Sequence, residues 1–304
     1  MACGANTDCD SGTCTNGKCV GCKVNADCTS NSCSGAPTDV CCTAGMSGCS
    51  GTCTNEQTDS SNCGGCGIVC GAGTSCASGI CQCLAVTSDL FAYYTFDATL
   101  ADFSGNGHTA TGSNLASVGG KIGTAYGFDG SNSMVELSGV AGTFSGARSF
   151  CAWVNPAATT QTLPVLEVGY TFTTFADGDM FSLNGSQAGT GLCGETASVP
   201  FLDHWAAGCY LGGSAAPANA WSFVCWTWDG QSALTTYVNG TPKVSAGAMY
   251  GYPIDTMYIG ANTIGGSTTS AWFSGDIDEV GIWTCALSAA NVSTLYNNGA
   301  GFRP

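Results

Sequence analysis

Cysteine is the residue type in this chain with the clearest capacity for chemistry. Seventeen of the 22 cysteines fall in the first 83 residues. The pair Cys63-Gly64-Gly65-Cys66 has the two-residue gap that zinc ribbons use, but a structural zinc site needs a second such pair, and this segment contains no histidine. Such density is typical of an oxidising compartment, so we expect disulfides rather than zinc or iron–sulfur ligation. The spacing does not determine which cysteines pair.

The cysteine spacing repeats along the first half. The texts "CGANTDCDSGTC" and "CKVNADCTSNSC" begin at Cys3 and Cys22, share the same first two gaps, and carry Asp8 and Asp27 at the same place. A different unit, "NCGGCGIVCGAGTSCASGICQC", follows. Residues 1–83 are therefore expected to form a disulfide-rich spacer or stalk with short hairpins at its glycine-rich turns. An alternative for Cys3 is that it is the lipidated residue of a cleaved lipoprotein signal.

Charge and hydropathy exclude several classes of partner. The chain has 21 acidic and 6 basic residues and a formal net charge of −15, which argues against nucleic acid and anionic lipid surfaces. No stretch approaches 18 apolar residues, so we expect no membrane insertion. The first 20 residues lack an apolar run, so we take the chain to be a mature or recombinant product. An extracellular or cell-surface location is expected.

The second half is built differently, because all 30 aromatic residues follow Asp89. Short β-rich runs alternate with Gly, Asn and Asp turns. The predicted strands are 90–96, 125–128, 134–137, 149–155, 165–169, 180–183, 221–228, 234–238, 257–259 and 277–283. Asn239-Gly240 predicts a hairpin. Ser288 is expected to begin one short helix, with Val292, Leu295 and Tyr296 on one face. Residues 84–304 are thus predicted to be an all-β, two-sheet antiparallel jelly-roll sandwich.

Ordered landmarks in the second half carry a family resemblance. They are "FAYYTFD", "DFSGNG", "AYGFDG", "SFCAWVNP", "WSFVCWTWDG", "YVNGTP", "YIGAN", "FSGDIDEVGIW" and "ALSAANVSTLYNNG". Together, over about residues 90–301, they resemble the laminin-G-like, concanavalin A-like lectin and glucanase family. The resemblance implies a jelly roll whose first and last strands lie side by side, sugar or protein binding, and in many members a Ca²⁺. The first half resembles the cysteine-rich repeats of secreted and surface proteins of delta-proteobacteria, which implies extracellular display and no activity.

Some relatives of this kind are β-glucanases with a strand motif E-x-D-x-x-E, and retaining glycosidases need two carboxylates about 5–5.5 Å apart. The nearest text is "GDIDEVG". Strand alternation is expected to place Asp276 and Asp278 on one face and Glu279 on the other. Because no second glutamate follows on their face, we expect no enzyme activity. The two histidines, His108 and His204, are expected to be turn or surface residues rather than bases.

The loop "DATLADFSGNG" offers oxygen ligands of the kind that Ca²⁺ prefers. Asp97, Asp102 and Asn106 are candidate ligands, and Asp278 would join them if the first and last strands are neighbours, as the resemblance implies. Asp129 is a weaker candidate. The alternative is that Asp102 and Asn106 make Asx turns and that Asp278 accepts from a backbone donor. No organic cofactor is expected.

A long glycine-rich loop from Phe172 to Ala218 is the expected binding site, because irregular insertions at a sandwich rim often carry function. Trp205 and Tyr210 are the predicted stacking residues, with Phe175 and Asp177 beside them.

Five cysteines remain in the second half. Cys193 and Cys209 flank the binding loop and are expected to pair. Cys151 and Cys225 lie mid-strand in comparable texts and are the second expected pair. If the first strand pairs with the last, Cys83 lies beside Cys285, and this predicts a bridge that fastens the stalk to the sandwich.

These observations favour a secreted or surface-displayed, non-catalytic protein that binds an extracellular glycan or a surface protein. The alternative is a structural subunit that assembles with itself into a disulfide-crosslinked fibre, and an enzyme comes third.

Overall fold

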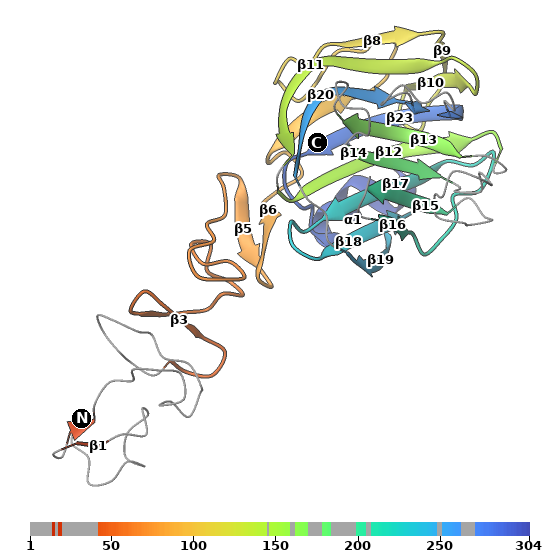
Figure 1. Cartoon of the computed structure of the whole chain (residues 1–304). Helices are drawn as coiled ribbons and strands as arrows, with labels where there is room; N and C mark the ends of the chain where they lie inside the picture. The colour runs from red at the N-terminus through yellow and green to blue at the C-terminus, as the bar shows by residue number, and fades with distance from the viewer. Residues whose placement is uncertain are drawn as a thin grey trace. The chain divides into compact units, whose positions relative to one another are not determined.

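The computed structural model describes residues 14–15, 18–19, 42–144, 146–158, 162–169, 178–183, 199–204, 208–247, 251–262 and 271–304 (Figure 1). The chain divides into two compact units, Met1–Gln82 and Cys83–Pro304. The division lies one residue before the boundary that the sequence predicts. Each unit is described by itself.

The first unit contains short two-stranded hairpins. Strand β1 (Cys14–Thr15) pairs with β2 (Lys18–Cys19), β3 (Ser47–Cys49) with β4 (Thr52–Thr54), and β5 (Thr74–Ala77) with β6 (Ile80–Cys83), whose last residue begins the second unit. Two-stranded hairpins of this length are not stable alone in water, so covalent bonds must hold them.

Four disulfides join the cysteines from Cys42 to Cys81. The pairs are Cys42–Cys53, Cys49–Cys66, Cys63–Cys76 and Cys70–Cys81. Each bridge closes a loop that contains one cysteine of the next bridge, so the four loops overlap in series. Cys63 and Cys66, the zinc-like pair, belong to different bridges. From Cys42 onward, the described cysteines include no free thiol.

Sulfur atoms form the interior of the described part of this unit. Its buried hydrophobic residues are all half-cystines, namely Cys42, Cys49, Cys63 and Cys76. The larger apolar side chains Met46, Ile68 and Val69 are instead 37%, 49% and 69% exposed. A segment of this kind cannot bury enough apolar surface to fold, and its disulfides replace the missing core.

The second unit is a sandwich of two antiparallel sheets. The 8-stranded sheet has the order β19-β18-β17-β12-β23-β10-β9, with β7 also paired to β23. Its strands are β7 (Leu90–Tyr94), β9 (Ala116–Gly119), β10 (Thr124–Asp129), β12 (Arg148–Pro156), β17 (Ser222–Trp228), β18 (Ala233–Val238), β19 (Thr241–Ala246) and β23 (Ser274–Trp283).

The 7-stranded sheet has the order β16-β15-β14-β13-β20-β11-β8. Its strands are β8 (Ala110–Ser113), β11 (Met134–Phe144), β13 (Leu163–Gly169), β14 (Gly178–Leu183), β15 (Pro200–His204), β16 (Gly208–Leu211) and β20 (Tyr252–Ile259). A small hairpin of β21 (Ala261–Asn262) and β22 (Ala271–Trp272) follows β20. The predicted jelly-roll sandwich is therefore confirmed, including the pairing of the first strand of the unit, β7, with the last, β23.

All ten predicted strands are present. Among the strands that the sequence did not show, β15 and β16 carry the buried residues Phe201, Leu202 and Tyr210 and lie in a segment expected to be an irregular loop, whereas three others are short and poor in large apolar residues. Strands β8, β9 and β19 read "ATGS", "ASVG" and "TPKVSA" and are mostly exposed. They lie at the outer parts of the sheets, where backbone pairing to a neighbour, rather than side-chain burial, holds them in place.

The predicted hairpin and helix are confirmed. Asn239 and Gly240 have φ angles of 50° and 76°, the left-handed conformation that a tight hairpin requires at both positions. Helix α1 (Ala289–Tyr296) begins after Ser288, whose side chain accepts a hydrogen bond from the Asn291 backbone, and it buries Val292 and Leu295.

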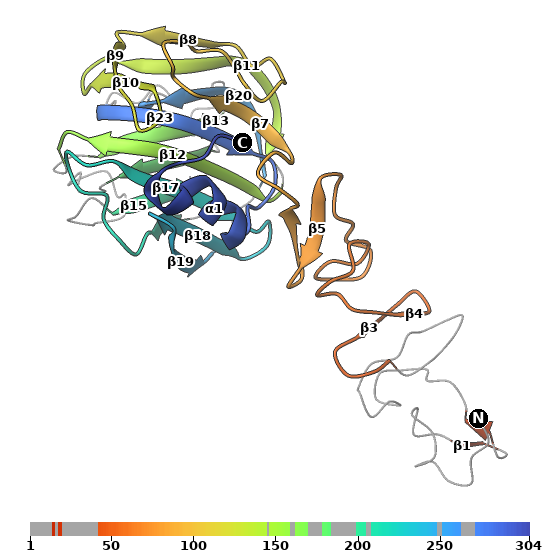
Figure 2. The ribbon, with the colours of Figure 1, turned by 180° about the vertical axis from the view of Figure 1, so that it is seen from behind.

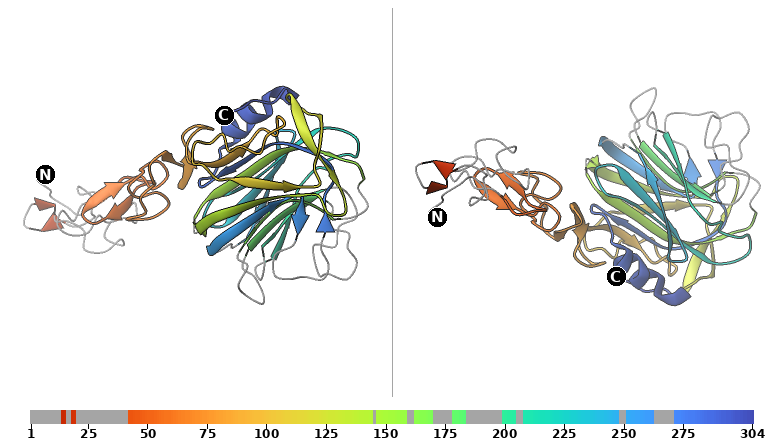
Figure 3. Two further views of the ribbon diagram at one scale, coloured as in Figure 1. Left: turned by 90° about the horizontal axis from the view of Figure 1, so that it is seen from above. Right: turned by 90° about the horizontal axis from the view of Figure 1, so that it is seen from below.

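Aromatic rings fill the space between the sheets. The Phe181 ring centroid lies 4.3 Å from that of Phe150 and 5.0 Å from that of Trp226, so rings from both sheets interlock. A second cluster, with Trp153, Phe223 and Trp283, lies between the 8-stranded sheet and α1. Figures 2 and 3 show α1 on the outer face of that sheet. The 8-stranded sheet is therefore covered on both faces.

One ion pair is buried between the sheets. Arg148 of β12 and Asp179 of β14 are 1% and 0% exposed, with Nη2 and Oδ2 2.7 Å apart. The Tyr252 hydroxyl donates to the same Oδ2 at 2.6 Å, and the guanidinium lies 4.5 Å from the Trp228 ring centroid. Asp179 and Tyr252 come from one sheet and Arg148 from the other, so this pair fixes how the two sheets face each other.

Two disulfides of the second unit join cysteines that are both among the described residues. Cys83 is joined to Cys285, and Cys151 to Cys225, which are the partners that the sequence suggests. Cys209 is also disulfide-bonded. Its expected partner, Cys193, lies outside the described residues.

Candidate functional site

The loop from Asp102 to His108 covers the outer edge of β7. The Asp102 carboxylate accepts hydrogen bonds from the backbone N–H groups of Tyr93, Ser104 and His108. The Asn106 amide donates to the carbonyl oxygens of Leu90 and Phe91 at 2.7 and 2.9 Å. The loop thus supplies partners that a further strand would otherwise give to β7, which protects the edge. The "DFSGNG" landmark is explained by this role.

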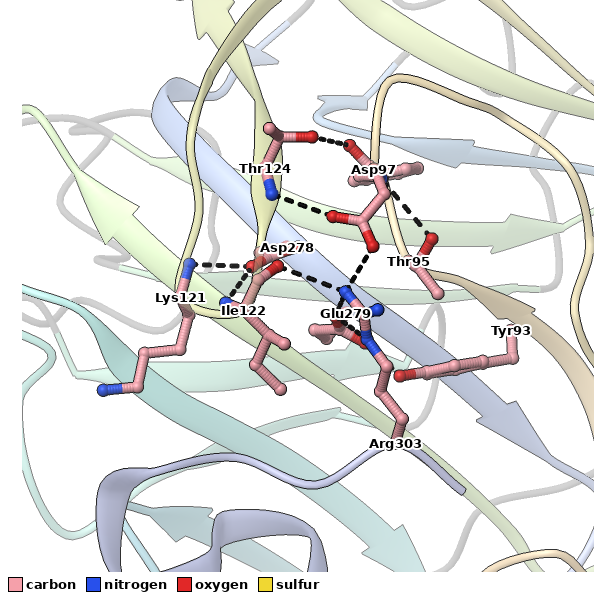
Figure 4. Close-up of polar contacts among 10 residues, drawn as sticks. Tyr93, Thr95, Asp97, Lys121, Ile122, Thr124, Asp278, Glu279 and Arg303 are labelled. Atoms are coloured by element: carbon pink, nitrogen blue, oxygen red, sulfur yellow. Dashed lines mark hydrogen bonds and ion pairs between the residues drawn. The ribbon is translucent and has the colours of Figure 1, made fainter.

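A second network of charged groups gathers near the end of the chain (Figure 4). The Arg303 guanidinium lies 2.5 Å from Asp97 Oδ2 and 2.6 Å from Glu279 Oε1. Asp97 also accepts from the Thr124 backbone at 2.8 Å, and the Tyr93 hydroxyl donates to Glu279. This network ties together the segment after β7, the start of β10, the middle of β23 and the C-terminal segment.

Asp278 lies beside this network but binds other partners. Its Oδ2 accepts from the backbone N–H groups of Lys121 and Ile122 at 2.8 and 3.0 Å, as Figure 4 shows. Its Oδ1 is buried without a hydrogen-bond partner. Burial, reinforced by the nearby Glu279 charge, raises the pKa of Asp278 to about 7. The hydrogen bonds from the two backbone donors lower this pKa, but burial outweighs them.

The four residues predicted to bind Ca²⁺ do not form one site. Asp102 and Asn106 belong to the edge-covering loop, whereas Asp97 and Asp278 bind donors from residues 121–124 and 303. Within the described ranges, no three carboxylate or imidazole ligand atoms lie within 4.8 Å of one another. As arranged, these residues do not fit a common calcium site. The contacts of Asp102 and Asp278 match the alternative of an Asx turn and accepted backbone bonds, whereas Asn106 donates to strand carbonyls instead of making an Asx turn. Asp129 likewise accepts from the backbone of Ser131, Asn132 and Ser133.

The carboxylates of β23 do not alternate as the sequence suggested. Glu279 has φ of 51°, and the pairing of β12 with β23 shifts register here, which marks a β-bulge. Ile277 and Val280 both face the core, so Asp278 and Glu279 lie together on the other side. The expectation that Glu279 faces away from Asp278 is wrong, because it assumed an unbroken strand.

This adjacent pair is closed to a substrate. Asp278 is 0% and Glu279 5% exposed, and Glu279 is engaged by Tyr93 and Arg303. A glycosidase must present its acid and its nucleophile or base to a sugar on opposite sides of the scissile bond. In the structure, the pair instead holds the strands and the C-terminal segment together.

A polar pocket of about 630 Å³ opens beside the start of β7. Phe91 and His108 stack in its wall with ring centroids 4.1 Å apart, and Asp89, Ser104 and Thr284 line it as well. In the described part of the chain, neither the Asp89 carboxylate nor the His108 ring nitrogens have a hydrogen-bond partner. The pocket therefore combines an aromatic wall with unused donors and acceptors.

The expectation of one long irregular loop from Phe172 to Ala218 is wrong for the described residues, because they include strands β14, β15 and β16 of the 7-stranded sheet. Trp205, Phe175 and Asp177 lie outside the described residues. Tyr210 is 8% exposed and belongs to the core between the sheets, where burial and the Asp179 charge raise its pKa. Its ring packs against the core rather than facing solvent.

Of the residues that line the pocket, the sequence singles out Asn106, but as a metal ligand, and it suggests a turn or surface position for His108. Nothing in the sequence singles out Asp89. Asp89 has φ of 50°, an uncommon conformation that side-chain patterns do not reveal. The sequence offers one signal for the pocket, since polar residues stand beside a ring residue in two short texts. These are "SDLF", where the first strand begins, and "SGNGH", in the loop that covers the edge of that strand.

The chain was compared with protein families, with curated proteins and with solved structures. A family model described as the concanavalin A-like lectin/glucanases superfamily matches residues 129–293. A search of curated proteins finds no match.

Solved structures share the fold at low sequence identity. Domain 4 of an extracellular arabinanase from Geobacillus stearothermophilus, solved with arabinotriose, is 22% identical with a TM-score of 0.52, covering 70% of this chain and 98% of that domain. A botulinum neurotoxin serotype D/C binding domain is 12% identical with a TM-score of 0.53, covering 72% of this chain and 54% of that one. A related toxin domain in complex with SialylT is 12% identical with a TM-score of 0.50, covering 72% and 53%.

This chain spans about half of the two toxin domains, and all three likenesses show the fold alone. Over more than half of its length the chain matches the family model, on a two-sheet sandwich of the kind that the model describes. The chain belongs to the concanavalin A-like lectin/glucanase superfamily.

Proposed function

We propose that the chain is a non-catalytic glycan-binding protein of the cell exterior, and that its sandwich binds a sugar in the pocket beside Phe91 and His108. The pocket is the observation that carries the proposal. Sugar recognition uses an aromatic surface for the apolar face of the ring and polar groups for its hydroxyls. The stacked rings and the Asp89 carboxylate supply both.

The crosslinks and the composition support the proposed location. Disulfides of this density persist only in an oxidising environment. Among the residues that the structure describes, no helix has the length and apolarity that crossing a bilayer demands. The solved relatives bound to arabinotriose and SialylT support a glycan as the class of ligand.

The absence of catalysis is part of the proposal. The carboxylates of β23 are buried and bound by groups of the chain itself, which supports a structural role. Incubation of the chain with each glycan that it binds, followed by mass spectrometry of the glycan, tests this part. We expect the glycan to be unchanged, and a shortened product would establish an enzyme.

Assembly into a fibre is the less favoured alternative. Strand β19 is one of the outer strands of the 8-stranded sheet, and it carries Pro242 and Lys243. Proline and lysine on an edge strand oppose the addition of further strands. Electron microscopy and sedimentation over a range of concentrations would reveal filaments if this alternative were right.

A glycan array probed with the full chain tests the function, and Asp89→Asn tests the site. Asparagine keeps the size of the side chain and tolerates the left-handed backbone at this position. A hydrogen bond to a charged group contributes about 1.5–3 kcal/mol, so we expect a loss of about tenfold or more in affinity. Glu136→Gln, which removes the same charge on β11 of the other sheet, is the matched control and should bind normally. No glycan bound, or binding unaffected by Asp89→Asn, would contradict the proposal.

A further inference from the structure

The bridge Cys83–Cys285 joins the two ends of the sandwich. Cys83 is the first residue of the second unit, and Cys285 lies two residues after the end of β23. The bridge spans a sequence separation of 202 residues. Both cysteines are buried, and the backbone around them is paired: Cys83 N–H donates to the Ala286 carbonyl at 2.9 Å, and the Asn291 amide donates to the Cys83 carbonyl at 3.1 Å.

Strands β7 and β23 would be exposed to tension without this bridge. They pair antiparallel, with Leu90 opposite Trp283, so the start of the first strand and the end of the last lie at the same end of the pair. Pulling these two ends apart would load the ladder bonds between the strands one at a time. This unzipping geometry is weak because each backbone hydrogen bond breaks before the next is loaded.

From this connectivity we propose that the chain bears tension and that the Cys83–Cys285 bridge carries the load past the sandwich. Force that enters from the first unit crosses the disulfide directly to Cys285 and leaves through residues 286–304. The strands between the two cysteines then carry none of it. This function goes beyond glycan binding and requires no ligand.

The described part of the first unit is built in the same way. The bridges from Cys42 to Cys81 close overlapping loops, so a covalent path through sulfur connects each loop to the next. Extension of Cys42–Cys81 under load is limited by these bonds rather than by hydrogen bonds. The load-bearing path from Cys42 to Cys285 is therefore reinforced by disulfides throughout.

From Cys42 onward, the segment after Cys285 is the part of this path that is held by non-covalent contacts. Helix α1 packs on the 8-stranded sheet through Val292 and Leu295, and Arg303 binds Asp97 and Glu279. Pulling on the C-terminus would detach Arg303 first and α1 next. At about 3.6 Å per residue, this segment would lengthen the chain by only about 65 Å.

Single-molecule force spectroscopy on the full oxidised chain, held by peptide tags at its two ends, tests the proposal. In the wild type we expect no release step from the sandwich. In Cys83→Ala/Cys285→Ala the sandwich should open and add a release on the order of 400 Å, because the Cys151–Cys225 bridge keeps 74 of the 202 residues closed. Cys151→Ala/Cys225→Ala, which removes a bridge outside the load path, is the control and should match the wild type.

Addition of reductant to a tethered wild-type molecule gives a second measurement if the variant does not fold. The long release should appear only after reduction. A long release from the oxidised wild type would overturn the proposal, and so would a folded Cys83→Ala/Cys285→Ala chain that extends no further than the wild type.

Discussion

The two units of this chain are held in their folded structures by different kinds of bond. In the described part of the first unit, the buried hydrophobic residues are all cysteines, and the apolar side chains of Met46, Ile68 and Val69 are exposed. In the second unit, rings such as Trp226 and Phe181 interlock between two sheets. The comparison shows that a chain without aromatic residues can still hold a fixed shape, provided that covalent bridges take the place of a core.

The largest effect should come from the buried ion pair of the sandwich. Arg148→Ala leaves the Asp179 carboxylate buried without its guanidinium, so we expect the sandwich to lose about 3–5 kcal/mol of its free energy of unfolding. Arg303→Ala is the comparison, because Arg303 is 37% exposed and its pairs should contribute only about 1 kcal/mol. Urea denaturation followed by tryptophan fluorescence measures both variants, and equal losses would show that burial does not distinguish them.

Removal of one disulfide from the first unit should destabilise that unit and leave the stability of the sandwich unchanged. Cys63→Ala/Cys76→Ala opens a loop with a sequence separation of 13, and it should destabilise that unit by about 2–4 kcal/mol. We expect rapid proteolysis within residues 42–82 and an unchanged thermal midpoint for the sandwich. A lowered midpoint of the sandwich would mean that the two units do not depend on separate bonds.

The free energy of unfolding of the sandwich should depend on pH, which should distinguish it from the crosslinked first unit. Burial raises the pKa of Asp278 to about 7 in the folded state, whereas the unfolded carboxyl titrates near its ordinary value. Between about pH 4 and 7 the folded state therefore binds more protons, so stability falls as the pH rises through this range.

Asp278→Asn tests this dependence, because it keeps an oxygen for the Lys121 and Ile122 donors but cannot titrate. The slope of sandwich stability against pH, from urea denaturation between pH 4.5 and 7.5, should become shallower in the variant. An unchanged slope would show that Asp278 is not responsible.

The smallest effect concerns the helix on the outer face. Ser288→Ala removes the acceptor for the Asn291 backbone and should cost about 1 kcal/mol. Ser293→Ala, at an exposed position within the same helix, should be neutral or slightly stabilising. If both variants behave alike in denaturation, the cap contributes nothing.

Much of the fold was predictable because it depends on local patterns. The runs around Phe150, Val165 and Trp226 are rich in β-branched and aromatic residues, and Asn239-Gly240 specifies its own turn. Strand β8 and strand β9 were not predictable, since their small polar residues form strands only because neighbouring strands offer backbone partners.

The candidate site was less predictable, because it depends on departures from regular geometry. The bulge at Glu279 places two consecutive carboxylates on one side of a strand, which alternation alone would forbid. The pocket brings Asp89 and His108 together across a loop whose path is set by Asp102 and Asn106. The sequence identified Asp102 and Asn106 as important but suggested metal binding. The Asp102 oxygens that could bind a metal instead accept backbone N–H groups, and Asn106 acts through its amide N–H rather than its oxygen.

Hydrogen exchange of the full chain, followed by mass spectrometry with and without reductant, tests most directly whether the two units rely on different bonds. We expect reduction to abolish protection of the amides in residues 42–82 while β12, β17 and β23 keep theirs. Retained protection in residues 42–82 after complete reduction, or loss of protection in those strands at the same rate, would contradict the account.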